Sequence, residues 1–538
     1  MTLAPDARPA LPDLDAYAKR ILGSKVYQAA VETPLDPLPR LAARVGRPVL
    51  IKREDQQPVF SFKIRGAFNK MASLTAAERA RGVICASAGN HAQGVAFAGQ
   101  RLGIAATIVM PRTTPGIKVR AVEDRGAQVL LVGNAFDEAL AHARMLEAER
   151  GLTFIHPFDD PDVIAGQGTV GLEILRQHAG DIEAIFVPVG GGGLASGIAA
   201  FVKYLRPEIK IIGVEPVEAA SMAAALKAGR RVKLDSVGLF ADGVAVREAG
   251  EETYRLCRAL LDDVILVDTD AICAAIKDIF DDTRTIAEPS GALSLAGLKL
   301  YAERHPAGAG SLIAINSGAN MNFDRLRHVA ERAEIGEHRE ALLAVTIPER
   351  PGSYRALIQL LGNRAVTEFN YRYADPRAAQ IFIGVQLTRG VAEKQALMAE
   401  LVAADYPVID MSDNELAKLH IRYMVGGRAT ALSDELLYRF QFPERPGALL
   451  DFLTRMAGTW DISLFHYRNH GADYGRVLAG IRVPPADYPA FERFLAELDY
   501  PCWSETRNPA YGMFLSGIEP PRDTPVPRHT VSRAESPA

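Results

Sequence analysis

The segment VPVGGGGLASGI, residues 187–198, runs from an apolar strand-like stretch through four consecutive glycines into a helical pattern. Because glycine has no side chain, several backbone N–H groups can converge on one small anion, and the N-terminus of the following helix adds its dipole. No Gly-Lys-Ser/Thr follows, so the segment is not a P-loop, and it lacks the GxGxxG spacing. We interpret it as a phosphate-binding loop; the alternative is a flexible turn. The loop comprises Gly190, Gly191, Gly192, Gly193 and Leu194.

Working outward from this loop, strand-like and helical patterns alternate from about residue 30 to 320. The apolar runs are rich in β-branched residues and continuous, as expected of strands that are buried on both faces of a sheet. Helical stretches of roughly 10–15 residues separate most of them, which is typical of βα units around parallel sheets. The runs lie at residues 48–52, 82–87, 106–110, 127–132, 184–189, 210–215 and 311–316.

A second strand-to-helix turn is ASAGNHAQG, residues 86–94. Its small residues leave main-chain N–H groups accessible near an expected helix start, where a carboxylate could bind. A simple helix-capping turn is at least as good an explanation of this segment alone. The candidate carboxylate-binding residues are Ser87, Ala88, Gly89, Asn90 and His91.

A third segment, SFKIRGAF at residues 61–68, places Lys63 between two apolar residues near the start of a helical pattern. A single lysine is usually a solvated surface charge. A lysine that forms an imine instead needs a desolvated site that favours its neutral amine. One such lysine, a phosphate loop and a carboxylate site together suggest an amino acid bound to pyridoxal phosphate (PLP).

The last third of the chain contains an internal repeat. The string Pro-Glu-Arg-Pro-Gly occurs at residues 348–352 and again at residues 443–447, and the sequences around the two copies are similar. Each copy predicts a strand, a Pro-Gly turn, a helix and further strands. We interpret the repeat as a duplicated small α+β module.

Composition and charge exclude several classes of function. The chain has 538 residues, 48% hydrophobic and 23% charged, with a formal net charge of −4 and scattered basic residues, so a nucleic-acid footprint is missing. Its four cysteines are far apart, which argues against a disulfide framework or a zinc site, and we assign no metal. The uncharged run at residues 184–202 holds Pro188 and five glycines, so it predicts strand, loop and helix rather than a membrane span. We expect a cytoplasmic protein.

Four segments in this order, SFKIRGAF, SAGNHAQG, VPVGGGGLASG and NSGAN (residues 316–320), resemble motifs of the fold-type II PLP enzymes. From about residue 20 to 517 the chain resembles the biosynthetic threonine ammonia-lyases, whose long form carries two ACT-like domains. The resemblance implies an α/β fold with two open α/β subdomains, as in the tryptophan synthase β-subunit, followed by a duplicated ferredoxin-like α+β regulatory module. The expected organisation is a flexible segment at 1–19, a PLP-dependent catalytic domain at 20–320, a connecting helix at 321–339, ACT-like domains at 340–412 and 435–507, and a disordered tail at 519–538.

The resemblance also implies roles for individual residues. Lys63 matches the catalytic lysine that holds the cofactor covalently. Asn90 matches the residue that binds the 3′ oxygen of the cofactor, and Ser317 matches the hydroxyl that meets its pyridine nitrogen. Gly190 to Gly193 with Leu194 match its phosphate loop. Glu288, in the segment AEPSGA, is either a group near the cofactor or simply an acid at a helix N-terminus.

The activity implied by the resemblance is dehydration and deamination of L-threonine to 2-oxobutanoate and ammonia, the first committed step of isoleucine biosynthesis. A homotetramer inhibited by isoleucine, with valine opposing it, is part of the same expectation. Alternatives are a broad-specificity serine/threonine dehydratase, a β-replacement enzyme, or an amino-acid sensor with a decayed catalytic domain. The candidate effector-binding residues are Leu449, Leu450, Leu453, Tyr371 and Tyr467.

Overall fold

The computed structural model forms two compact units, Met1–Ala333 and Glu334–Ala538, which we describe separately. Helix α14 (Arg325–Gly336) contains the boundary between them. The residues that the structure describes are 13–348, 356–357, 360–362, 364, 366–370, 377–423, 434–443, 452, 455–456, 459–468, 474–498 and 500–515.

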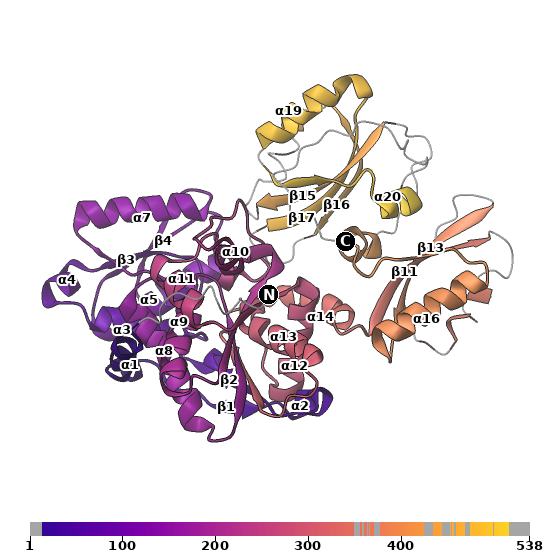
Figure 1. Ribbon diagram of the computed structural model, residues 1–538. Coiled ribbons are helices and arrows are strands. Elements are labelled where there is room, and N and C mark those ends of the chain that lie inside the picture. Colours follow the sequence, from indigo (N-terminus) through magenta and orange to yellow (C-terminus); the bar gives the residue numbers. More distant parts are fainter. Residues whose placement is uncertain are drawn as a thin grey trace. The chain divides into compact units, whose positions relative to one another are not determined.

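The first unit contains two sheets (Figure 1). In the larger sheet strand β1 is antiparallel to its neighbour and the remaining pairs are parallel. Its order is β1 (Leu35–Pro37), β2 (Val49–Arg53), β10 (Ser311–Asn316), β7 (Ile182–Pro188), β8 (Lys210–Pro216) and β9 (Asp263–Val267). The smaller sheet is parallel throughout. Its order is β5 (Gln128–Leu131), β4 (Ala106–Met110), β3 (Val83–Ala86) and β6 (Thr153–Phe154). Every apolar run that was predicted to be a strand is one.

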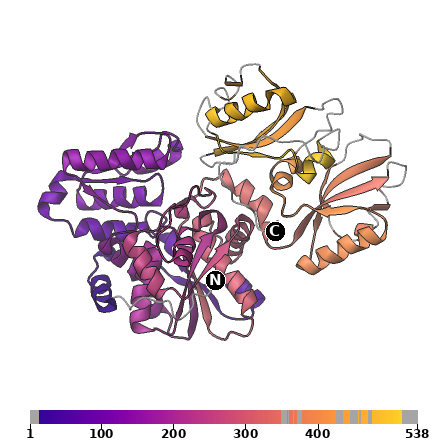
Figure 2. The ribbon, with the colours of Figure 1, turned by 45° about the horizontal axis from the view of Figure 1, so that its top comes forward.

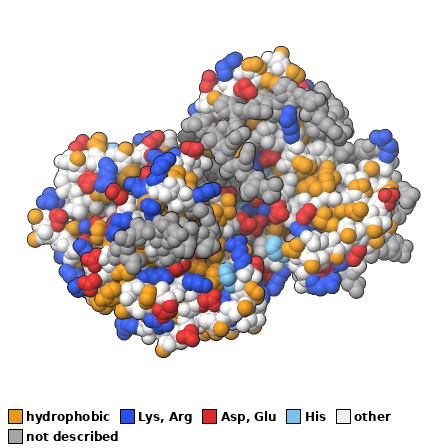
Figure 3. Space-filling view, in the orientation of Figure 1, with side chains coloured by type: hydrophobic (Ala, Val, Ile, Leu, Met, Phe, Trp, Pro, Cys, Tyr) orange, Lys and Arg blue, Asp and Glu red, His pale blue; other side chains and the backbone are white. Residues whose placement is uncertain are grey.

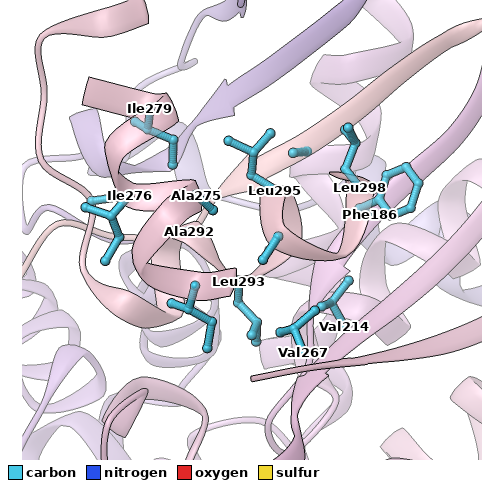
Figure 4. Packing of buried hydrophobic residues seen from close by; sticks show 14 of the residues in the cluster. Phe186, Val214, Val267, Ala275, Ile276, Ile279, Ala292, Leu293, Leu295 and Leu298 are labelled. Carbon is cyan, nitrogen blue, oxygen red and sulfur yellow. The ribbon is translucent and has the colours of Figure 1, made fainter. Parts of the chain in front are cut away.

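Helices cover both faces of the larger sheet (Figures 1 and 2). Successive strand residues point to opposite faces, so Phe186 packs against one helical layer and Ile185 against the other. Figure 4 shows the first layer, where Leu298 of α13 lies beside Phe186. The helices are α1 (Leu14–Leu22), α2 (Pro39–Val45), α3 (Lys63–Ala72), α4 (Ala76–Arg81), α5 (Asn90–Leu102), α6 (Gly116–Glu123), α7 (Phe136–Arg150), α8 (Pro161–Gln177), α9 (Gly193–Leu205), α10 (Ser221–Ala228), α11 (Glu251–Leu260), α12 (Thr269–Thr283) and α13 (Pro289–Arg304).

The expectation of a flexible segment through residue 19 is wrong for its last residues, because α1 begins at Leu14. The side chain of Asp13 caps this helix by accepting a hydrogen bond from the Ala16 N–H at 3.1 Å. Tyr17 and Ile21, one turn apart, are buried. The helix is therefore held by an apolar face that the sequence analysis overlooked.

The second unit contains two antiparallel sheets with the same strand order. Strands β11 and β15, which begin at Glu340 and Glu435, occupy equivalent central positions, and this confirms the duplicated α+β module. The first sheet runs β12 (Val366–Asn370), β13 (Ala378–Gln386), β11 (Glu340–Pro348) and β14 (Val408–Asp410); the second runs β16 (Asp461–Arg468), β17 (Tyr474–Arg482), β15 (Glu435–Pro443) and β18 (Cys502–Ser504). Besides the end of α14, the helices in the described part of this unit are α16 (Gly390–Ala403), α17 (Glu415–Leu419), α19 (Tyr488–Leu498) and α20 (Pro509–Phe514). Most of both Pro-Glu-Arg-Pro-Gly strings lies outside the described residues.

In the described part of the chain, no helix combines the length and apolar character needed to cross a membrane. On the face seen in Figure 3, acidic and basic side chains of the first unit are interspersed. All four cysteines are buried with free thiols.

Candidate active site

The four-glycine loop connects β7 to the N-terminus of α9 and is tightly enclosed. A Cβ atom at Gly191 would lie 2.3 Å from the ring of Phe158, and one at Gly190 would lie 2.9 Å from Cα of Val244. The backbone of Gly192 has φ +94°, a left-handed conformation that glycine adopts without strain. Glycine is thus required here by the neighbouring residues. The main-chain N–H groups at the start of α9 remain suited to an anion.

Lys63 is the first residue of α3, and its Nζ donates a hydrogen bond to the Pro157 carbonyl oxygen at 3.0 Å. Burial lowers the pKa of Lys63 to about 8, and the charge of Glu288 opposes this shift only in part. Pro157 directly precedes Phe158, so one short segment contacts both the lysine and the four-glycine loop. A lysine in this setting is neutral to a much larger fraction near neutral pH than an exposed lysine, and the neutral amine is the form that imine chemistry requires.

A buried charge network fixes the helix that carries Lys63. Arg65 donates to Glu54 at 2.7 Å and to Glu173 of α8 at 2.9 Å. Lys52 on β2 completes the network with an ion pair to Glu173 at 2.6 Å. Burying these two cations with two anions leaves the cluster without net charge, which is the condition for keeping charges in a protein interior. The network ties α3 to both β2 and α8.

The predicted carboxylate-binding turn connects β3 to α5, which begins at Asn90. The Gly89 N–H donates to Ser87 Oγ at 3.3 Å, and a Cβ atom at Gly89 would meet nothing within 4 Å. The imidazole of His91 is already engaged, since its Nε2 lies 2.8 Å from the Ile155 carbonyl oxygen. Burial lowers the pKa of His91 to about 3, so this ring is neutral. An anion at this turn would therefore meet main-chain N–H groups and the Ser87 hydroxyl.

Ser317 follows β10 and lies beside the lysine segment. Its Oγ donates to the Ser290 carbonyl oxygen at 3.1 Å, and its own carbonyl oxygen accepts from the Phe62 N–H at 3.2 Å. Ser61 and Gly318 form an antiparallel bridge next to this contact. The loop after β10 and the loop before Lys63 are consequently held together by main-chain hydrogen bonds.

Asn90 lies at the centre of a row of hydrogen bonds between side chains. Its Nδ2 donates to Glu288 Oε1 at 2.6 Å, while its Oδ1 accepts from Asn320 Nδ2 at 2.7 Å. Glu288 occupies the N-cap position of α13, but its carboxylate makes no capping hydrogen bond. Of the two interpretations of Glu288, contact with a site residue is therefore the one that the geometry favours. Burial, together with the charge of Asp242, raises the pKa of Glu288 to about 7.

Sequence reasoning missed Asn320, Phe158 and Pro157 as site residues. Asn320 ends the quoted motif NSGAN, so a signal for it was present. Nothing in the local sequence marks the segment at 156–160. Among the candidate effector residues, Leu449, Leu450, Leu453 and Tyr371 lie outside the described residues. Tyr467 lies on β16 opposite Val477 of β17, and its side chain is outside the described part of the structure.

The site has features that fit a bound polar cofactor. The side-chain oxygens of Ser61 and Ser290 are buried and have no hydrogen-bond partner within the described residues, although buried polar groups normally have one. The second N–H of Asn90 likewise has no acceptor among those residues. A desolvated lysine, an anion-binding helix start and spare hydrogen-bonding groups match the amine-reactive, anionic and polar parts of PLP. No group of three or more described His, Cys, Asp and Glu residues could hold a metal ion.

Comparisons with known proteins agree with this geometry. The family described as "Pyridoxal-phosphate dependent enzyme" matches residues 26–318. The family described as "C-terminal regulatory domain of Threonine dehydratase" matches twice, at residues 331–421 and 426–515. The chain is therefore built as a PLP-dependent enzyme followed by two regulatory domains, which confirms the predicted fold class and cofactor.

The relatives identify the family more closely. The chain is 59% identical over 503 residues to "L-threonine dehydratase biosynthetic IlvA" of Burkholderia multivorans, covering 93% of this chain and 99% of the relative. It is 55% identical over 506 residues to the protein of the same name from Escherichia coli, covering 94% and 98%. It belongs to the biosynthetic threonine dehydratases.

Solved structures give the same result for part of the chain. The processed form of threonine deaminase isoform 2 from Solanum lycopersicum has a TM-score of 0.60 and 51% identity, covering 62% of this chain and 93% of that one. A threonine deaminase from T.th. has a TM-score of 0.53 and 38% identity, covering 59% and 99%. A maize serine racemase also matches, with a TM-score of 0.56 and 33% identity over 61% of this chain and 99% of that one.

Proposed function

We propose that this chain converts L-threonine to 2-oxobutanoate and ammonia, with PLP bound at Lys63, and that it catalyses the first committed step of isoleucine biosynthesis. The observation that carries the proposal is the desolvated amine of Lys63, whose pKa of about 8 lies close to neutral pH, next to the segment that encloses the four-glycine loop. Relatives 51–59% identical to this chain carry the name threonine dehydratase.

The chain offers a group for each part of the cofactor. Lys63 holds it covalently, and the N–H groups of Gly190 to Gly193 and Leu194 hold its phosphate at the start of α9. Asn90 donates to its 3′ oxygen, and Ser317 meets its ring nitrogen. When bound, PLP supplies an electron sink for the negative charge left at the substrate α carbon.

The remaining chemistry belongs to the chain's own residues. Lys63 can accept the α proton of threonine once its amine no longer holds the cofactor, and the lowered pKa of about 8 in the unloaded chain indicates that a substantial fraction of this free amine would be neutral near that pH. The main-chain N–H groups of Ala88, Gly89 and Asn90, with the Ser87 hydroxyl, hold the substrate carboxylate. The β-hydroxyl leaves as water, and water is then taken up as ammonia departs, so the net products are 2-oxobutanoate and ammonia.

The direct test is production of 2-oxobutanoate and ammonia from L-threonine by the purified chain loaded with PLP. We expect both products in equal amounts, and L-serine as a comparison substrate measures how far the site discriminates by the β-methyl group. If L-threonine gives no 2-oxo acid while the chain holds PLP, the proposed activity is wrong.

The two C-terminal domains are proposed to bind effectors, with isoleucine inhibiting and valine opposing it in a homotetramer. Support comes from the two matches to a regulatory domain of threonine dehydratase. The proposed contacts include Leu449, Leu450, Leu453, Tyr371 and Tyr467. Isoleucine must then favour a state that binds threonine poorly, typically by about 1–3 kcal/mol of coupling.

A chain that ends at Glu337, just after α14, tests this regulatory assignment. We expect it to retain threonine dehydration and to be insensitive to isoleucine. Full inhibition of the truncated chain would place the effector site in residues 1–337 instead.

A cytoplasmic location is proposed as well, supported by four free cysteines and by the lack of a membrane-spanning helix among the described residues.

A further inference from the structure

Asn320 connects three parts of the candidate site. Its Nδ2 donates to the Val59 carbonyl oxygen at 2.8 Å and to Asn90 Oδ1 at 2.7 Å. Its main-chain N–H donates to the Glu288 carboxylate. Val59 lies four residues before Lys63, Asn90 begins α5, and Glu288 precedes α13. One asparagine side chain thus spans the lysine segment and the turn at the end of β3.

The donor and acceptor in each of these hydrogen bonds can be assigned by starting from the Val59 carbonyl. A backbone carbonyl only accepts hydrogen bonds, so Val59 requires Asn320 to turn its amide nitrogen toward it. That nitrogen also faces Asn90, and therefore Asn90 must turn its oxygen toward Asn320. The amide nitrogen of Asn90 is left facing Glu288. Each amide orientation follows from the previous one, and the first follows from the main chain.

The other end of the chain requires the same orientation. Glu288 Oε1 accepts from Asn90 Nδ2 at 2.6 Å, and above pH 7, where this carboxylate is mostly ionised, it has no hydrogen to donate. If the Asn90 amide were reversed, its oxygen would face the Glu288 carboxylate and its nitrogen would face the Asn320 nitrogen. Both contacts would then be mismatched in a region where Asn90 is 9% and Glu288 3% exposed. Mismatched buried polar groups cost far more than exposed ones.

We propose that Asn320 is a positioning residue that sets the orientation of the Asn90 amide, so that the spare N–H of Asn90 is offered as a hydrogen-bond donor to the cofactor. The inference rests on the proposed function, in which Asn90 donates to the 3′ oxygen of PLP. A reversed or rotating Asn90 would present an oxygen to that position and repel it. Asn320 itself acts through Asn90.

The variant Asn320→Asp tests this in the full-length enzyme, because it keeps the shape of the side chain and replaces the donor by an acceptor. The primary readout is the dissociation constant for PLP; the second is kcat and KM for L-threonine. We expect the dissociation constant to rise by about tenfold or more, the size of one lost hydrogen bond to a charged group. The matched control Asn322→Asp makes the same chemical change two residues further on and is expected to stay within about twofold of wild type.

A double-substitution cycle separates positioning from general damage. In an Asn90→Ala background the group that Asn320 orients is absent, so Asn320→Asp should weaken PLP binding by less than about threefold there. An equal loss in both backgrounds, or no loss in the wild-type background, overturns the inference. If Asn90→Ala alone leaves PLP binding unchanged, the proposed role of Asn90 fails, which is a different outcome.

Folding is checked by the melting temperature of each variant. If Asn320→Asp does not fold, Asn320→Ala takes its place, since it removes both donated hydrogen bonds without adding charge. The same criterion applies: a loss of PLP affinity that disappears in the Asn90→Ala background supports the inference, and a loss that persists there contradicts it.

Discussion

Two glycine-containing turns at the ends of parallel strands differ in what surrounds them. After β7, a Cβ atom at Gly191 would lie 2.3 Å from the Phe158 ring. After β3, a Cβ atom at Gly89 would meet nothing within 4 Å. Both turns lead into the N-terminus of a helix, α9 and α5. Glycine therefore allows close packing against Phe158 in the turn after β7, whereas in the turn after β3 it leaves open space.

This difference separates the two proposed ligands. The turn enclosed by Phe158 is tightly packed by the protein itself, as suits the phosphate of a cofactor that stays bound. The turn at Gly89 has room beside its main chain, as suits the carboxylate of a substrate that enters and leaves in every cycle. Lys63 lies close to both turns. It contacts Pro157, which precedes Phe158, and it begins the helix that packs against α5.

The largest effect should come from changing the chemistry without touching either turn. Lys63→Ala removes both the covalent attachment of PLP and the amine that accepts the α proton, so kcat for L-threonine should fall by about 10⁴-fold or more. The variant should stay folded, which a cooperative melting transition would show. Near-wild-type release of ammonia by this variant would remove Lys63 from the mechanism.

Gly191→Ala tests the enclosed turn. Its methyl group would overlap the Phe158 ring, and such overpacking should destabilise the fold by about 3 kcal/mol and weaken PLP binding. Urea unfolding measures the first effect and PLP titration the second. The double variant Gly191→Ala with Phe158→Ala should lose less stability than the sum of the single changes, because the overlap is gone. Strict additivity would show that Phe158 is not what requires glycine here.

Gly89→Ala tests the open turn. The added methyl group meets no protein atom, so stability should change by less than about 0.5 kcal/mol. The same methyl group would occupy space meant for the substrate, and KM for L-threonine should rise by about tenfold with PLP affinity unchanged. The comparison fails if Gly89→Ala destabilises the fold as much as Gly191→Ala, or if its KM equals that of wild type.

The last expected effect, a change of a few degrees in melting temperature, is a pH dependence of stability in the PLP-free chain. The pKa of Lys63 is lowered from 10.5 to about 8, so between these pH values the unfolded chain binds more protons than the folded one. Wild-type stability should therefore rise with pH across this window relative to Lys63→Met, which lacks the amine. Below pH 8 the variant should melt a few degrees higher. Parallel melting curves from pH 7 to 10.5 would contradict the buried amine.

Much of the fold was predictable because its strands are continuous apolar runs. All seven runs that were identified are strands, whereas β9 (Asp263–Val267) was missed since it follows directly on a helix and begins with an acidic residue. Strands β1 and β6, with three and two residues, are too short for any periodicity. Helix α1 (Leu14–Leu22) was missed because the expected organisation placed residues 1–19 in a flexible segment.

The site was predictable where it depends on turns with unusual composition and less so where it depends on packing. The glycine run and the lysine motif can be recognised directly in the sequence. Phe158 and Pro157 reach the site only because α8 and its preceding segment pack beside α3 and α9. The partners of Asn90 come from two distant segments, at residues 288 and 320, and no local pattern connects them.

The measurement that tests the central claim most directly is borohydride reduction of the PLP-loaded enzyme, followed by peptide mapping of the phosphopyridoxyl group. The account predicts that the label lies on Lys63, between the enclosed turn and the open one, and that L-threonine added before reduction lowers the labelling. Lys118, whose Nζ is paired with Asp242 at 2.7 Å, is an internal comparison that should stay unlabelled. A label on Lys118, or on any lysine other than Lys63, would contradict the account.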